Sequence, residues 1–289
     1  LPAPQSSIVL ADGSEVSDKV ELALGESISF AAKCDNVEPS RYMWRLNTVL
    51  RSIDPTYTFT AETPGTYTVT LEVYNAQDVP GEKTQLTIVV YGPYKNGVFF
   101  LLEGNMSSEN GTICFVDENG AFFANPYGEA NPVNGRPSSP GNVLQDMFIY
   151  KDNAYFITQN GAQNGQGARL TIADATTLKM KKQFSGSIDD SSVWPQHIVV
   201  IDENKAYIRY SSSDMEATSG IRVMDLASGV WSGNDIEGTS GAFTVEGSTK
   251  ARMLLLGDKV YAPCGQYLRI IDTKTDKSGI DIHIAPGTK

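Results

Sequence analysis

The second half of the chain repeats with a period slightly above 50 residues, and this repeat limits the available folds more than any other feature. Each copy consists of an apolar run, a polar turn and a strand that carries a tyrosine. The copies are Met147–Tyr155, Ile198–Tyr207 and Met253–Tyr261, and their tyrosines are 52 and 54 residues apart. A period near 50 residues, built from short strands with no helical pattern between them, is typical of β-propeller blades.

Each copy continues into a second strand that closes on an aspartate. These strands are Leu170–Asp174, Ile221–Asp225 and Leu268–Asp272. We expect each aspartate side chain to cap a turn into the outer strand, because Asp side chains stabilise turns by hydrogen bonding to nearby backbone groups. One carboxylate per blade is far short of a calcium site.

A partial earlier copy at Val98–Leu102 and Ile113–Asp117 brings the total to under four repeats, whereas seven blades would need roughly 350 residues at this period. The expectation is an incomplete propeller. The alternative is a compact four-blade ring, which the alternating segment Ile280–Ile284 could close by joining the blade that contains Val98–Leu102.

The first half follows a different pattern, a strict alternation of apolar and polar residues. In Gly65–Tyr74, the residues Tyr67, Val69, Leu71 and Val73 fall on one face. Six or seven such short runs in about 90 residues predict a sandwich of half-buried antiparallel strands. The whole chain is therefore predicted to be all-β.

Composition and motifs exclude several functions. A formal charge of −11 and a pI near 4.7 leave no basic face for nucleic acid, and no apolar run reaches the roughly 20 residues of a transmembrane segment. Two histidines cannot supply a multi-histidine metal site. No catalytic signature of a hydrolase, nucleotide-binding enzyme or zinc protease is present, so we expect no catalytic residues, no metal and no cofactor.

Residues 57–75, with the spacing Tyr-x-Phe followed by Gly-x-Tyr-x-Val-x-Leu-x-Val-x-Asn, resemble the C-terminal hairpin of PKD-like domains, and Trp44 matches the core tryptophan of that family. The resemblance implies an immunoglobulin-like spacer of extracellular proteins over residues 1–91. Residues 92–97 are then a linker, and residues 98–289 are the propeller repeats.

The second half resembles the YncE-like, surface-layer type of β-propeller, and Glu103–Asn105 leading to Asn110–Ile113 is similar to an opening blade of that family. A PKD-like module followed by such a propeller occurs in cell-surface lipoproteins of gut bacteria, and one branch binds vitamin B12 for a TonB-dependent transporter. The resemblance implies an extracellular protein, lipid-anchored outside this segment, with an outer-membrane transporter as a partner.

The repeat also indicates a candidate site. Immediately before the apolar run of the three full copies stand Asp146, His197 and Arg252, and Gln145 and Gln196 precede the first two. If the apolar run is the innermost strand, these positions converge at one mouth of the central channel. They either pair with one another and solvate the channel, or form a polar ring that orients a ligand. The aromatic residues that could then stack on the ligand are Trp194, Tyr210 and Trp231.

The leading hypothesis from sequence is a non-enzymatic surface protein whose propeller captures a small molecule, either a corrinoid or a glycan, or a partner protein. One alternative is a propeller enzyme acting on polysaccharide, a lyase or glycosidase, which would need a cluster of carboxylates or of Tyr, His and Arg in one pocket. The other is a structural adhesion subunit with a flat apolar face.

Overall fold

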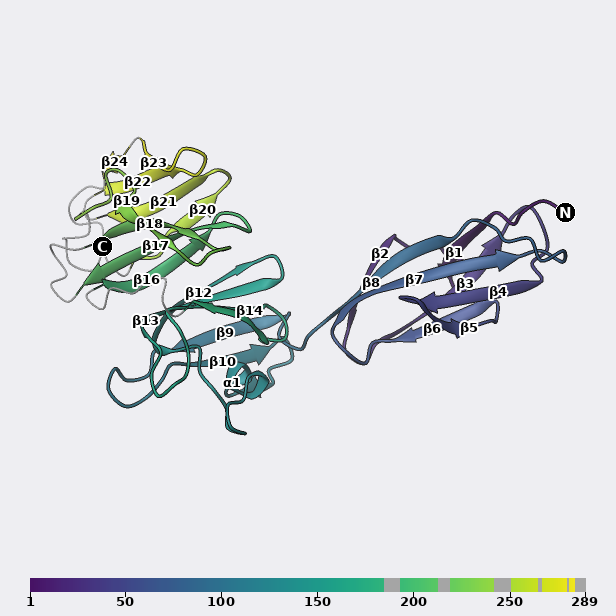
Figure 1. Cartoon of the computed structure of the whole chain (residues 1–289), viewed down its shortest axis with the longest axis horizontal. Helices are drawn as coiled ribbons and strands as arrows, with labels where there is room; N and C mark the ends of the chain where they lie inside the picture. The colour runs from purple at the N-terminus through teal and green to yellow at the C-terminus, as the bar shows by residue number, and fades with distance from the viewer. Residues whose placement is uncertain (185–192, 213–218, 242–250, 265–266, 280, 284–289) are drawn as a thin grey trace. The chain divides into compact units, whose positions relative to one another are not determined.

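A computed structural model describes residues 1–184, 193–212, 219–241, 251–264, 267–279 and 281–283. Apart from one short helix, its regular structure is β-sheet, as the sequence predicted. The chain divides into two compact units, Leu1–Lys95 and Asn96–Lys289 (Figure 1).

The first unit is a sandwich of two sheets. The smaller sheet has the order β1 (Ser6–Leu10), β3 (Ser27–Cys34), β6 (Thr56–Thr60). The larger sheet has the order β2 (Lys19–Ala23), β8 (Thr84–Tyr91), β7 (Gly65–Tyr74), β4 (Arg41–Leu46), β5 (Val49–Ser52).

Two features of this sandwich differ from the prediction. Strands β2 and β8 pair in parallel, which is possible because most of the unit connects them. The sequence alternation predicted strands at Glu21–Leu24, Ser27–Ala31, Tyr42–Leu46, Tyr57–Thr60, Gly65–Tyr74 and Gln85–Val90, and therefore missed β1 and β5. β5 forms through a tight hairpin after β4, in which Asn47 takes the left-handed conformation with φ 56°.

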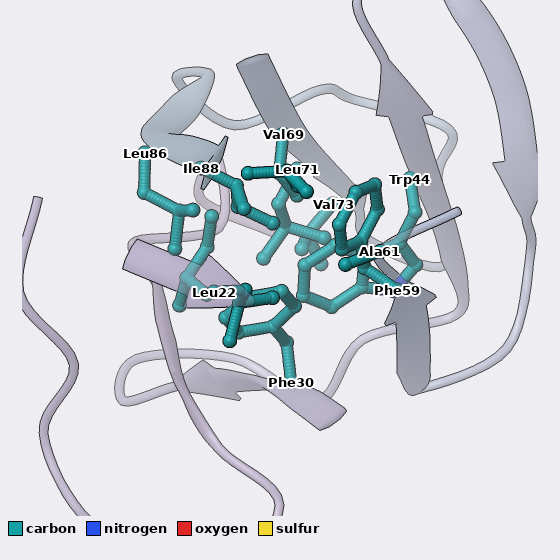
Figure 2. Close-up of a cluster of buried hydrophobic side chains, with 12 residues drawn as sticks. Leu22, Phe30, Trp44, Phe59, Ala61, Val69, Leu71, Val73, Leu86 and Ile88 are labelled. Atoms are coloured by element: carbon teal, nitrogen blue, oxygen red, sulfur yellow. The ribbon is translucent and has the colours of Figure 1, made fainter. Parts of the chain in front are cut away.

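The core of the first unit lies on the predicted face of β7. Val69, Leu71 and Val73 have no exposed surface (Figure 2). Trp44 is also fully buried, with its ring centroid 6.5 Å from that of Phe30, and its indole N–H donates to the Asp54 carbonyl at 3.0 Å. Trp44 therefore joins the two sheets through packing and satisfies its one polar group.

The second unit consists of propeller-type blades. Its described residues form four antiparallel sheets in chain order. The first has the order β11 (Phe122–Phe123), β10 (Thr112–Asp117), β9 (Gly97–Leu102). The second is β12 (Asn142–Tyr150), β13 (Asn153–Gly161), β14 (Leu170–Asp174), β15 (Met180–Phe184). The third is β16 (Val193–Val200), β17 (Lys205–Ser212), β18 (Gly220–Asp225), β19 (Trp231–Asp235). The fourth is β20 (Leu254–Leu256), β21 (Lys259–Cys264), β22 (Tyr267–Asp272), β23 (Lys277–Ser278), with β24 (Ile282–His283) also paired to β22.

The second, third and fourth sheets pack on one another through apolar side chains. One cluster joins the second and third sheets, with Ile157 and Leu170 against Ile198 and Ile208. Another joins the third and fourth sheets, with Tyr207 and Ile221 against Val260. The strand at Ile282 pairs with β22 and not with the sheet that contains Val98, so among the described residues it does not close a ring.

A short helix, α1 (Pro126–Ala130), stands between the first and second sheets, where no helical pattern was expected. It begins at Asn125, whose side-chain oxygen accepts the Gly128 N–H at 3.0 Å, and proline follows directly at the first helical position. With five residues it has too little periodicity for a sequence pattern to reveal it.

The three predicted aspartate turns are confirmed, and Asp117 in the partial copy forms a fourth. Asp174 accepts the N–H groups of Thr176 and Thr177 at 3.0 and 2.9 Å. Asp225 and Asp272 make the same two contacts with the residues two and three positions ahead, and Asp117 accepts the N–H groups of Asn119 and Ala121. These turns place the third and outer strands of each blade side by side.

The Asp272 turn should make the stability of the second unit sensitive to acid. A hydrogen bond from Lys259, followed by that from the Lys274 N–H, lowers the pKa of Asp272 to about 2 from its ordinary 3.8. A carboxyl with a lowered pKa stabilises the fold at pH values above its unfolded pKa, and this contribution is lost as the pH falls through its folded pKa. We expect the melting temperature of the second unit to fall between about pH 4 and pH 2, and less steeply in Asp272→Asn. Calorimetry over this range measures the slope, and equal slopes for the two proteins would contradict the prediction.

Candidate functional site

The structure brings Asp146, His197 and Arg252 together. His197 Nδ1 lies 3.3 Å from Asp146 Oδ2, and the Arg252 guanidinium donates to Asp146 Oδ1. The Ile198 N–H also donates to Asp146 Oδ2, at 3.2 Å. Three blades therefore meet at one carboxylate, from β12, from β16 and from the segment that leads into β20.

The three side chains differ in exposure. Asp146 and His197 are buried, with 4% and 10% of their side chains exposed, whereas 67% of the Arg252 side chain is exposed. Arg252 also donates to the Met147 carbonyl at 3.3 Å, and among the described residues it has no other hydrogen-bond partner. The carboxylate is thus occupied by its protein partners, and it holds a guanidinium whose remaining N–H groups face solvent.

Both glutamines before these residues sit at bulges of the inner strands. The register of β12 with β13 shifts between Leu144 and Asp146, and that of β16 with β17 shifts between Pro195 and His197. A bulge changes the direction of side chains and often lies beside a functional site. Val143, next to the first bulge, has φ 56°, a strained conformation for a β-branched residue.

The two glutamine amides have different partners. Gln145 Nε2 donates to Glu103 Oε1 at 2.5 Å, which adds the first blade to the cluster. Gln196 is buried and its Nε2 donates to Ser211 Oγ at 2.7 Å, whereas its Oε1 accepts no hydrogen bond from the described residues. A buried amide oxygen without a donor carries a desolvation cost that a donor group of a ligand would remove.

The predicted stacking residues do not all offer an open ring. Tyr210 is buried, and its hydroxyl donates to Asp235 Oδ1 at 2.7 Å. Its ring centroid lies 5.4 Å from that of Trp231, edge to face, and Arg222 lies 4.7 Å from each ring. Burial, followed by the hydrogen bond to Asp235, raises the pKa of Tyr210 to about 12, so its phenol stays neutral. Trp194 and Trp231 are partly exposed, and their contact with a ligand stays a prediction.

Two residues of this region, Glu103 and Arg209, were not predicted as part of the candidate site. Glu103 directly follows the apolar run of the partial copy, so its position was a usable signal. Arg209 pairs with His197 across β16 and β17. It is fully buried at a core position of the strand, although its side chain is charged. It donates to the Ala251 and Pro263 carbonyls, and burial lowers its pKa to about 10. The alternation of apolar and polar residues in the sequence could not predict that backbone carbonyls would accept the hydrogen bonds of a buried arginine at this position.

Among the described residues, no group of three or more His, Cys, Asp or Glu side chains is placed so that it could hold a metal ion. No helix in those segments has the length and apolar character needed to span a bilayer.

The fold and this site define an all-β protein with propeller-type blades that converge on a polar cluster. The chain belongs to the family described as a domain of unknown function, DUF5074, whose model matches residues 96–285. No curated protein matches the chain.

The chain is also similar to solved structures. A quinoprotein alcohol dehydrogenase-like protein from Bacteroides thetaiotaomicron is 15% identical with a TM-score of 0.40, and the similarity covers 98% of this chain and 62% of that one. This chain therefore spans less than two thirds of that protein's length. Apo AztD from Citrobacter koseri is 11% identical with a TM-score of 0.33, and the coverages are 89% and 92%. A DUF4784 family protein from Bacteroides caccae is 10% identical with a TM-score of 0.37, and the coverages are 97% and 84%.

Proposed function

We propose that this chain is a non-enzymatic binding protein and that its second unit takes a small ligand at the ends of the inner strands. The observation that carries the proposal is the exposed Arg252 guanidinium, held in place by the buried carboxylate of Asp146. Because this ion pair fixes the side chain before a ligand arrives, binding loses little side-chain entropy.

The chemistry of the cluster favours a ligand rich in hydrogen-bond acceptors that also carries donors. Arg252 supplies N–H groups to a phosphate, carboxylate or hydroxyl, and Gln196 Oε1 supplies a buried acceptor. A corrinoid is the first candidate, since it combines a phosphodiester with amide side chains, and a glycan is the second.

A binding role suits the state of the carboxylate better than acid or base catalysis does. Asp146 already accepts hydrogen bonds from Arg252 and from the Ile198 N–H and lies beside His197, so both of its oxygens are engaged by protein groups and its carboxylate is buried. We propose further that the first unit is a PKD-like spacer at the cell surface, that the protein is lipid-anchored outside this segment, and that an outer-membrane transporter is the partner that receives the ligand.

Titration calorimetry against a panel of cobalamins and of host and plant glycans tests this function. We expect one class to bind, and we expect Arg252→Gln to weaken that binding at least about tenfold through loss of a charge-assisted hydrogen bond. Lys274→Gln is the matched control, because Lys274 is a similarly exposed cation, paired with Asp258 at 2.8 Å in a turn of the fourth sheet. No binding by any compound at high micromolar concentration would instead favour the structural role.

A further inference from the structure

Among the described residues, the first blade lacks one strand that the second, third and fourth blades have. In the second, third and fourth sheets, the strand that starts after the polar turn is second in the order, and an inner strand covers its free side. β9 occupies that second position, because it pairs with β10, the strand that closes on the Asp117 turn, just as β13 pairs with β14 before the Asp174 turn. In the first sheet, however, β9 is an edge strand, because the order is β11, β10, β9.

The edge of β9 is open in two respects. Its backbone pairs with β10 on one side only, so the N–H and C=O groups on the other side have no strand partner among the described residues. Its alternate side chains are also uncovered, since Val98, Phe100 and Leu102 are 58%, 50% and 51% exposed. A long apolar edge strand of this kind is a template for pairing with a further strand.

The other three blades show what fits this position. There, the inner strand runs antiparallel to the second strand and contributes a short apolar run. These runs are Met147–Tyr150, Ile198–Ile201 and Met253–Leu256. Connectivity excludes the chain before β9 as their counterpart, because β8 belongs to the first unit and ends at Tyr91, a few residues before β9. The strand at Ile282 is excluded as well, since it is paired with β22.

We propose that the free edge of β9 is a strand-acceptor site that binds an extended peptide segment, antiparallel to β9, with apolar side chains in the pattern of the inner strands. Main-chain hydrogen bonds supply affinity in this mode of recognition, and alternate side chains supply register. The occupant is a peptide strand, and the ligand proposed at Arg252 plays no part in it.

Peptides that copy the chain's own inner strands test the proposal. The probe is residues 145–150, with a C-terminal lysine tail for solubility, and the control carries proline in place of Phe148, which removes a backbone donor and disfavours pairing. We expect saturable binding of the probe to the full chain, at least tenfold weaker binding of the control, and slowed amide hydrogen exchange confined to residues 97–102.

Variants of the chain locate the binding. Phe100→Asp should weaken peptide binding at least tenfold, whereas Leu254→Asp, which changes an exposed leucine on β20, should not. Should Phe100→Asp fail to fold, Val98→Lys makes the same test at a more exposed position. Equal binding by the parent chain and the β9 variants, or no slowing of exchange in β9, would overturn the proposal. So would a dimer whose β9 amides are already protected without peptide, because a second copy would then cover the edge.

Discussion

Trp44→Ala should lower the unfolding free energy of the first unit by about 3–5 kcal/mol, the usual cost of removing a fully buried aromatic side chain. The loss combines the contacts of the indole ring with Phe30 and Tyr57 and the hydrogen bond to the Asp54 carbonyl. Differential scanning calorimetry of the full chain measures it as a shift of one transition.

Trp231→Ala is the matched control, since Trp231 packs in the second unit and is partly exposed. It should shift the other transition, and by less. A single transition that moves with either substitution would show that the two halves do not unfold independently, contrary to their separate cores.

Asp146→Ala should destabilise the second unit by about 3 kcal/mol, because the substitution removes a buried charged acceptor from several partners at once. The buried Ile198 N–H loses its acceptor, and the buried His197 loses the carboxylate that lies 3.3 Å from its Nδ1, whereas Arg252 is exposed and regains water. Chemical denaturation, monitored by a probe in the second unit, gives the change in unfolding free energy.

Asp146→Asn separates the charge from the hydrogen bonds. It keeps one oxygen for the Ile198 N–H and should cost less than half as much as the alanine. It should still weaken ligand binding, because Arg252 loses its ionic partner. Equal stability of the aspartate and alanine proteins would mean that the carboxylate does not organise the inner-strand ends.

The repeat in the sequence predicted the blades well for two reasons. The strands of each blade alternate apolar and polar residues, and the turn before the outer strand is set by residues close to one another in the sequence. Asp174 and Asp272 show this code, since their hydrogen bonds join residues only two and three positions apart. The phase of the first blade was harder to predict. Val98–Leu102 is as apolar as an inner strand, and only its pairing with β10 shows that it is a second strand.

The site was predicted in part. The equivalent repeat positions of Asp146, His197 and Arg252 correctly indicated side chains that meet, because equivalent strands of adjacent blades point to a common end. Their roles depend on burial, which the repeat does not encode. Tyr210 is covered by its own cluster, and Arg209 is buried against backbone carbonyls that come from the segment before β20 and from β21.

Amide hydrogen exchange of the full chain, with and without the panel compound that binds most tightly, tests the ligand site most directly. We predict slowed exchange at residues 145–147 and 196–198, where the bulged ends of β12 and β16 surround Asp146. The hairpin turns at the other ends of these strands, where Lys151 pairs with Glu203, should be unchanged. Protection at those turns or in the first unit, with none around Asp146, would contradict the assignment of the ligand to the inner-strand ends.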